Sequence, residues 1–129
     1  IHGVPGEKKR RRLDFVAEES CWNWEPDEGY RLARRLLRRD APVRALLCMN
    51  DRLAFGAYQA ISELGLNVPR DIAIVSFDND ELAAYLRPGL TTIALPHEEM
   101  GRQAVDLLLS GAAKSETLVH MPLVIRGSL

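Results

Sequence analysis

Cysteine, histidine and aromatic residues are all scarce in this sequence of 129 residues. The two cysteines, Cys21 and Cys48, are too few and too far apart for a disulfide framework, so we expect reduced thiols. The three histidines lie singly, without the His-x-His or His-Glu-x-x-His spacing that places two imidazoles on one metal ion. These absences exclude a disulfide-rich fold and give no support for a metal site.

Motifs of the common catalytic folds are missing as well. The sequence has no P-loop, no Gly-x-Ser-x-Gly elbow and no Gly-x-Gly-x-x-Gly turn, which are signatures of phosphoryl, acyl and hydride transfer. No nucleophile is paired with a base in a recognisable pattern. We therefore expect neither an enzyme nor a bound cofactor.

Neither sign of charge predominates, since 17 Lys and Arg stand against 18 Asp and Glu. Without a basic field, a free-standing nucleic-acid-binding module is not expected. No apolar run approaches the roughly 20 residues that span a bilayer, and the first residues lack the charged-then-apolar order of a secretion signal. We expect a cytoplasmic protein without membrane contact.

What the sequence does contain is an alternation of short apolar runs and amphipathic segments. Continuous apolar runs at 44–49 and 72–77 predict strands buried on both faces, and the periodicity over 52–64 predicts a helix between them. Strand, helix and strand with short connections form a βαβ crossover, so the fold class is α/β with a parallel sheet. Further elements are predicted at 13–18, 90–95 and 118–126 as extended segments, at 26–39 and 97–110 as helices, and at 81–86 as a short helical turn.

Polar residues follow both central strands at the point where each ends. Asn50 and Asp51 form a polar cluster after the first apolar run, and residues 78–80 (Asp-Asn-Asp) form one after the second. Because the carboxyl ends of parallel strands meet at one edge of a sheet, we expect these residues to form a ligand site there. An ionised Asp78 offers only acceptors, which suits a sugar or a nucleoside, and Trp22 or Trp24 would supply a flat apolar surface for its ring.

Each of these residues also has a structural interpretation. Asp51 stands where a helix N-cap belongs, and Asp78 could cap the turn that begins near Asp80. A tryptophan is more often a packing residue than a ligand platform. The arginine stripe of the 26–39 helix is interpreted as a solvated face rather than a nucleic-acid ridge, because the chain is nearly neutral.

Several ordered motifs resemble those of a known family. They are residues 50–57 (NDRLAFGA), 63–78 (ELGLNVPRDIAIVSFD), 87–93 (RPGLTTI), 100–108 (MGRQAVDLL) and 123–128 (LVIRGS). The chain resembles, over about residues 13–129, the ligand-binding domain of the lactose/galactose-repressor (LacI/GalR) family of bacterial transcription regulators. That resemblance implies a periplasmic-binding-protein-like (type I) fold, in which two α/β lobes enclose an effector and a headpiece binds DNA.

The resemblance also implies how this chain is organised. It would be a truncated, parallel-sheet lobe, with about 1–93 and 120–129 in the C-terminal lobe and about 97–110 a helix of an otherwise missing N-terminal lobe. Such a helix would expose an apolar face, so we expect it to fold back onto its own lobe or to exchange with a second copy in a homodimer. DNA would be bound only through a headpiece absent from this chain.

Site residues follow from the resemblance position by position. Trp24 matches the aromatic set against the effector, Asn50 and Asp78 match positions that hydrogen-bond it, and Asp51 is left as the helix cap. Phe55 and Leu86 match positions in the family's dimer interface. The expected function is therefore effector sensing and dimerisation in a transcription regulator, with a fragment of a periplasmic sugar-binding protein of an uptake system as the alternative.

Overall fold

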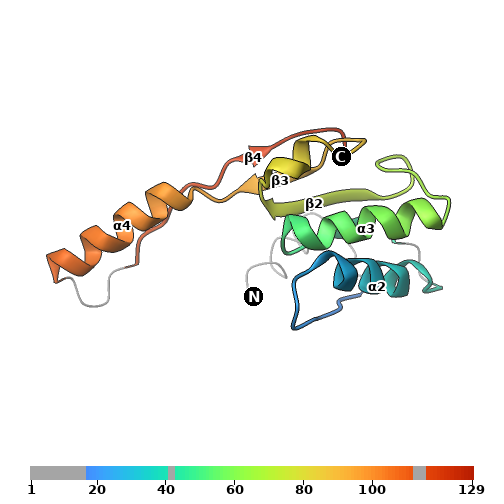
Figure 1. The fold of residues 1–129 in the computed structure, drawn as a ribbon, viewed down its shortest axis with the longest axis horizontal. Helices are drawn as coiled ribbons and strands as arrows, with labels where there is room; N and C mark the ends of the chain where they lie inside the picture. Colours follow the sequence, from blue (N-terminus) through green and yellow to red (C-terminus); the bar gives the residue numbers. More distant parts are fainter. Residues whose placement is uncertain (1–16, 41–42, 112–115) are drawn as a thin grey trace, which may run out of the picture.

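A computed structural model describes residues 17–40, 43–111 and 116–129 as four strands, three α-helices and one short 3-10 helix. Figure 1 shows a layered body from which one helix extends. In chain order the elements are α2 (Pro26–Leu37), β1 (Ala45–Leu47), α3 (Asp51–Glu63), β2 (Ala73–Asp78), η1 (Glu81–Ala84), β3 (Thr91–Ala94), α4 (His97–Ser110) and β4 (Leu123–Val124).

The sheet has the order β1-β2-β3-β4. The first three strands pair in parallel, and β4 pairs with β3 in the antiparallel sense. The predicted βαβ crossover is confirmed, because α3 connects the adjacent parallel strands β1 and β2. Beyond β4, the buried Ser128 Oγ donates to the Ile74 carbonyl at 2.6 Å and accepts from the Thr91 N–H at 2.8 Å, which joins the end of the chain to two strands.

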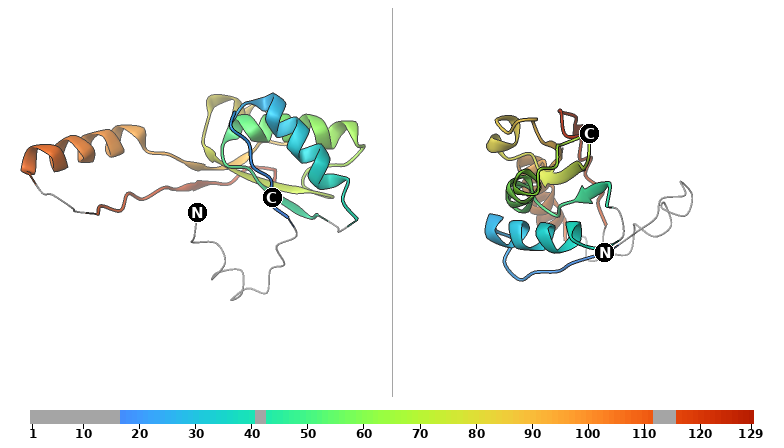
Figure 2. Two further views of the ribbon diagram at one scale, coloured as in Figure 1. Left: turned by 90° about the horizontal axis from the view of Figure 1, so that it is seen from below. Right: turned by 90° about the vertical axis from the view of Figure 1, so that its right-hand side faces the viewer.

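The helices form where caps and periodicity predict them. Pro26 occupies the first turn of α2, where its missing N–H costs nothing. The α3 helix ends just before Gly65, which has a φ of 71°, a left-handed conformation that glycine adopts without strain. Buried side chains of α3 face β2, and α2 packs beside α3 (Figure 2).

Burial of the sheet is one-sided, which corrects the expectation of strands buried on both faces. In β1 only Leu46 is buried, whereas Ala45 and Leu47 are exposed. In β2 the buried residues Ile74 and Ser76 alternate with partly buried ones. Successive side chains of a strand point to opposite faces of the sheet. Among the described residues, α3 covers one face, so in β1 and β2 only the side chains on that face are fully buried.

The α4 helix matches its predicted bounds and projects away from the body, joined to it at the His97 end (Figure 1). None of its residues is buried, and Leu108 is 81% exposed. The expectation that this helix folds back onto its own lobe is therefore wrong. Exchange with a second copy stays a prediction.

Two extended segments also differ from the sequence prediction. The strand predicted over 118–126 is limited to Leu123–Val124, because only these residues pair with β3. In the strand predicted over 13–18, residues 13–16 lie outside the described part of the chain, and residues 17–18 have no regular structure. No helix in the described part of the chain is long and apolar enough to cross a membrane.

Candidate ligand site

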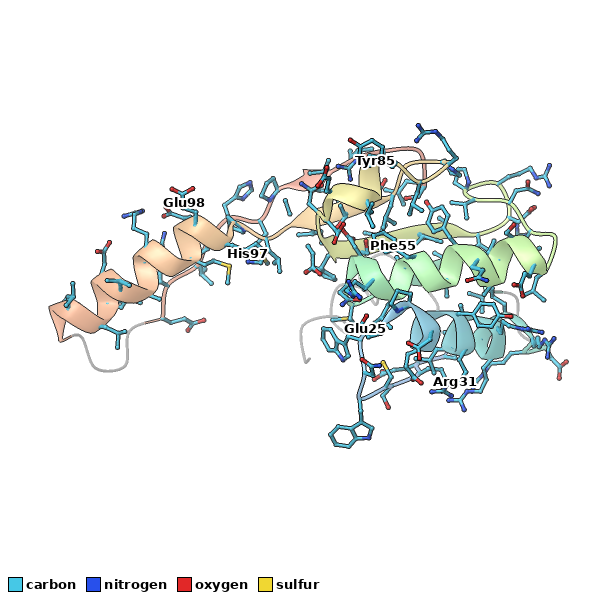
Figure 3. All side chains as sticks on the ribbon, viewed as in Figure 1. Glu25, Arg31, Phe55, Tyr85, His97 and Glu98 are labelled. Atoms are coloured by element: carbon cyan, nitrogen blue, oxygen red, sulfur yellow. The ribbon has the colours of Figure 1, made fainter. Side chains whose placement is uncertain are left out.

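Three parallel strands end at one edge of the sheet, and the N-terminal ends of α2, α3 and α4 gather there. Figure 3 shows Glu25 at the start of α2 and His97 at the start of α4 on this side of the body. The Asp80 N–H donates to Asp51 Oδ2 at 2.7 Å, so the residues that follow β1 and β2 are in contact. The prediction that both polar clusters share one edge is confirmed.

The cap of α3 is Asn50, not Asp51. Asn50 has extended φ and ψ angles, and its Oδ1 accepts from the Leu53 N–H at 2.8 Å. Its Nδ2 donates to the Trp24 carbonyl at 3.1 Å. Asp51 is already the first residue of the helix, and its side chain turns toward β2 instead of the free N–H groups. Asn50 is largely buried, at 9% exposure, and with one bond made by each side-chain group it has one N–H and one lone pair left.

Asp51 is fully buried, with both oxygens occupied. Oδ1 accepts from the Ser76 hydroxyl, and Oδ2 accepts from the Asp80 N–H. A buried carboxylate requires such partners, and the N-terminus of a helix favours its negative charge. Asp51 therefore lies behind the edge rather than on it.

Asp78 is the partly exposed acceptor of the edge. Burial raises its pKa above the ordinary value and the Asp51 carboxylate raises it further, while His97 and the Asp51 N–H lower it. Asp78 does not cap the following turn, because Asp80 does so by accepting from the Leu82 N–H at 2.8 Å. An acceptor in this setting suits a hydroxyl or amine donor of a ligand.

His97 also lies at this edge, although its isolated place among the histidines of the sequence indicates no metal site. It is exposed at the first position of α4, and its charge acts on Asp78. The signal was available, because His97 follows the third parallel strand just as Asn50 and Asp78 follow the other two. The rule that ligands bind at the carboxyl ends of parallel strands, applied to β3, predicts His97 at this edge.

Trp24 precedes α2 and is 48% exposed, next to Asn50 through its carbonyl. Trp22 is fully exposed, so neither tryptophan is a core residue. Glu25, between Trp24 and α2, forms an ion pair with Arg52, whose Nε lies 2.8 Å from Glu25 Oε2. The starts of α2 and α3 are thereby linked through both backbone and side-chain contacts.

Phe55 and Leu86, expected at a dimer interface, are partly buried and pack against the core in this single chain. Exposed apolar area comes from Leu82 and Tyr85, close to Leu86 in the sequence, which are 58% and 65% exposed. Figure 3 shows Tyr85 beside η1. The exposed apolar side chains therefore lie on η1 and the residue after it, whereas Phe55 itself is partly buried.

The arginines of α2 are compensated by local acids. Arg31 pairs with Glu28, Arg35 with Glu19, and Arg34 with Glu63. The interpretation of this stripe as a solvated helix face agrees with these pairs. Among the described residues, no group of three or more His, Cys, Asp or Glu side chains could hold a metal ion, and both cysteines are free.

Comparison with known proteins identifies this architecture. The family model of the periplasmic binding protein-like domain matches residues 2–129. The HTH-type transcriptional repressor PurR of Pasteurella multocida is 40% identical over 111 residues, which cover 82% of this chain and 33% of the repressor. The chain thus spans about a third of the length of the curated relatives it matches.

Solved structures of LacI-type regulators have the same fold. A Lac repressor bound to ONPG matches with a TM-score of 0.87 and 31% identity, over 96% of this chain and 39% of the repressor. A LacI family regulator from Arthrobacter sp. FB24, in complex with lactose, matches with a TM-score of 0.74 and 32% identity, over 97% of this chain and 49% of that one. This chain belongs to the periplasmic binding protein-like domain family and corresponds to part of the effector-binding domain of LacI/GalR regulators.

Proposed function

We propose that this chain senses a small-molecule effector as part of a bacterial transcription regulator. The observation that supports this most directly is the shared strand edge, where the partly exposed Asp78 lies with the cap residue Asn50 and the half-exposed Trp24. The P. multocida relative is named as a transcriptional repressor, which favours a regulator over the alternative of an uptake protein. It also argues against an enzyme.

The proposed effector is a sugar or a nucleoside. Asp78 would accept hydrogen bonds from its hydroxyl or amine groups, and the remaining N–H of Asn50 would donate to a ring or hydroxyl oxygen. The Trp24 ring would cover one apolar face of the ligand. The Arthrobacter neighbour was solved with lactose, which supports the sugar class.

The proposed mechanism is a population shift between open and closed lobes. Residues 1–93 and 120–129 would form one lobe, and α4 would pack in a second lobe that this chain does not contain. An effector that contacts both lobes stabilises the closed form and changes the geometry of a DNA-binding headpiece outside these residues. Such a regulator acts on DNA and is placed in the cytoplasm.

We further propose that the regulator is a homodimer through the face of Phe55 and Leu86. Leu82 and Tyr85 extend that face with exposed apolar area, which a second copy would bury. The two-fold symmetry of most homodimers would bring the same patch of both copies together.

Calorimetric titration with lactose, ribose and adenosine tests the effector proposal. We expect at least one of these ligands to bind and Asp78→Asn to weaken that binding about tenfold to a hundredfold, because one charged hydrogen bond is worth about 1.5–3 kcal/mol. Trp24→Ala should weaken it as well. Asp40→Asn, an exposed substitution beyond the opposite end of α2, is the control and should leave the affinity unchanged. Absence of binding to all three ligands would contradict the proposal.

A further inference from the structure

A buried carboxylate behind the ligand edge has no role in the function proposed so far. Asp51 has no exposed surface, so it cannot touch a ligand. Its two bonds go to Ser76 and Asp80, which stand two residues before and two residues after Asp78. The carboxylate thus holds both ends of the five-residue segment that presents Asp78.

That segment has an unusual backbone. Asp78 has a φ of 111° and Asn79 a φ of 59°, both in the region that residues other than glycine rarely adopt. Such conformations persist only where surrounding contacts determine them. Here the Asn79 N–H donates to Thr92 Oγ1 at 3.2 Å, and Arg126 Nη2 donates to Asn79 Oδ1 at 2.8 Å. The Asp51 bonds complete this set of contacts from the side of α3.

We propose that Asp51 is a positioning residue, which fixes the strained segment 76–80 so that the Asp78 carboxylate points into the ligand edge. The inference rests on the proposed function only for the identity of Asp78 as an effector contact. The bonds from Ser76 and Asp80 to Asp51 are present in the chain without a ligand. Asp51 would thus contribute to effector recognition through Asp78, although it is buried and touches no ligand itself.

The charge of Asp51 adds a second effect. Three groups act on Asp78 from the elements around it: Asp51 from α3, Asp80 from its own segment and His97 from α4. Burial and the two acids raise the pKa of Asp78, while His97 lowers it. Removing the charge of Asp51 should therefore let Asp78 stay ionised, and accept hydrogen bonds, at lower pH.

Three substitutions separate the effect of the Asp51 hydrogen bonds from the effect of its charge. Asp51→Asn keeps the shape, because the amide oxygen can accept from the Asp80 N–H and the amide nitrogen can donate to Ser76 Oγ. Asp51→Ala removes both bonds. Ser76→Ala removes one bond, and serves where Asp51→Ala does not fold.

The readouts need no ligand. In the 129-residue chain, ¹³C NMR of the carboxyl groups follows the titration of Asp78, and hydrogen exchange follows the Asp80 N–H. For Asp51→Asn we expect the Asp78 midpoint at lower pH and Asp80 exchange within about threefold of wild type. For Asp51→Ala or Ser76→Ala we expect Asp80 to exchange about tenfold faster or more.

Binding of lactose, ribose and adenosine at a series of pH values completes the test. Asp51→Asn should extend binding of any responsive ligand to lower pH, whereas Asp51→Ala should weaken it about tenfold at every pH. Unchanged Asp78 titration in Asp51→Asn, together with unchanged Asp80 exchange in Ser76→Ala and Asp51→Ala, would overturn the positioning role. Failure of the wild type to bind all three ligands would contradict the proposed function alone, because the ligand-free readouts still decide on Asp51.

Discussion

A single carboxylate accepts several hydrogen bonds in the turn before β2. Asp71 Oδ2 accepts from the Asn67 N–H at 2.8 Å and from the Arg70 guanidinium at 3.2 Å. The Arg70 hydrogen bond, followed by those from Asn67, lowers the pKa of Asp71 to about 2. Because the folded turn stabilises the ionised form of Asp71, the stability of the fold depends on pH.

The folded and unfolded pKa values of Asp71 determine the pH range over which it stabilises the fold. An unfolded Asp has a pKa of about 3.9, so the ionised Asp71 contributes fully above about pH 5 and loses its contribution as the pH falls toward 2. Asp71→Asn should therefore be less stable than wild type near neutral pH, with the difference shrinking between about pH 4 and pH 2. Urea unfolding across this range measures it.

Arg70→Gln provides a matched variant for the same measurement. Removal of the guanidinium should move the folded pKa of Asp71 back toward its ordinary value, so that the loss still begins near the unfolded pKa but is smaller and ends at a higher pH. A difference between wild type and Asp71→Asn that is constant from pH 7 to pH 2 would contradict the prediction.

At the scale of elements, α2 and α3 approach each other backbone to backbone. A Cβ at Gly56 would lie 1.8 Å from the Pro26 carbonyl oxygen, and one at Gly29 would lie 2.0 Å from the Leu53 carbonyl oxygen. Backbone atoms cannot rotate away as a side chain can, so only glycine permits this spacing. The close approach is also what allows Asn50 at the start of α3 to reach the carbonyl of Trp24.

Gly56→Ala should separate the two helices and lower the free energy of unfolding by about 1–3 kcal/mol or more. Thermal and urea unfolding followed by circular dichroism measure this loss. Gly101→Ala is the matched control, since a Cβ there meets nothing within 4 Å, and it should leave stability equal or slightly higher. A Gly56→Ala chain as stable as wild type would show that the helices can move apart without cost.

At the scale of the whole molecule, the exposed α4 helix is the main departure from a compact domain. Its apolar side includes Met100, Val105 and Leu108, which are 42%, 54% and 81% exposed. Isolated domains rarely keep such a surface in water. A second copy of the chain, offering the same helix, is the partner that we expect to cover it.

For the isolated 129-residue chain we predict a homodimer that exchanges α4, whereas the Phe55 and Leu86 face is proposed for the whole regulator. Leu108→Lys should raise the dimer dissociation constant at least tenfold, because burial of a leucine contributes about 1.5–3 kcal/mol. Ser110→Lys adds the same charge on the polar side of the helix and is the control. Sedimentation velocity at several concentrations measures the effect.

The same experiment distinguishes the two dimer surfaces. If Leu86→Lys dissociates the dimer and Leu108→Lys does not, association uses the Phe55 and Leu86 face instead of α4. A wild-type chain that stays monomeric at tens of micromolar would contradict both forms of association.

Much of the architecture is determined locally. The bounds of α4 and the parallel pairing of β1 with β2 through α3 follow from apolar periodicity, caps and stop signals within short windows. The meeting of the residues that follow β1 and β2, seen in the bond from the Asp80 N–H to Asp51, also follows, since the carboxyl ends of parallel strands lie at one edge. That Trp24, Asn50 and Asp78 contact an effector remains a prediction.

Tertiary structure decided what local patterns leave open. Neighbouring Asn50 and Asp51 are both good caps, and their roles separated only when β2 placed Ser76 and the Asp80 N–H beside Asp51. The one-sided burial of β1 and the projection of α4 depend on which elements are present to cover them. Periodicity identifies the apolar face of a segment, but the covering partner is set by contacts distant in sequence, which no local window contains.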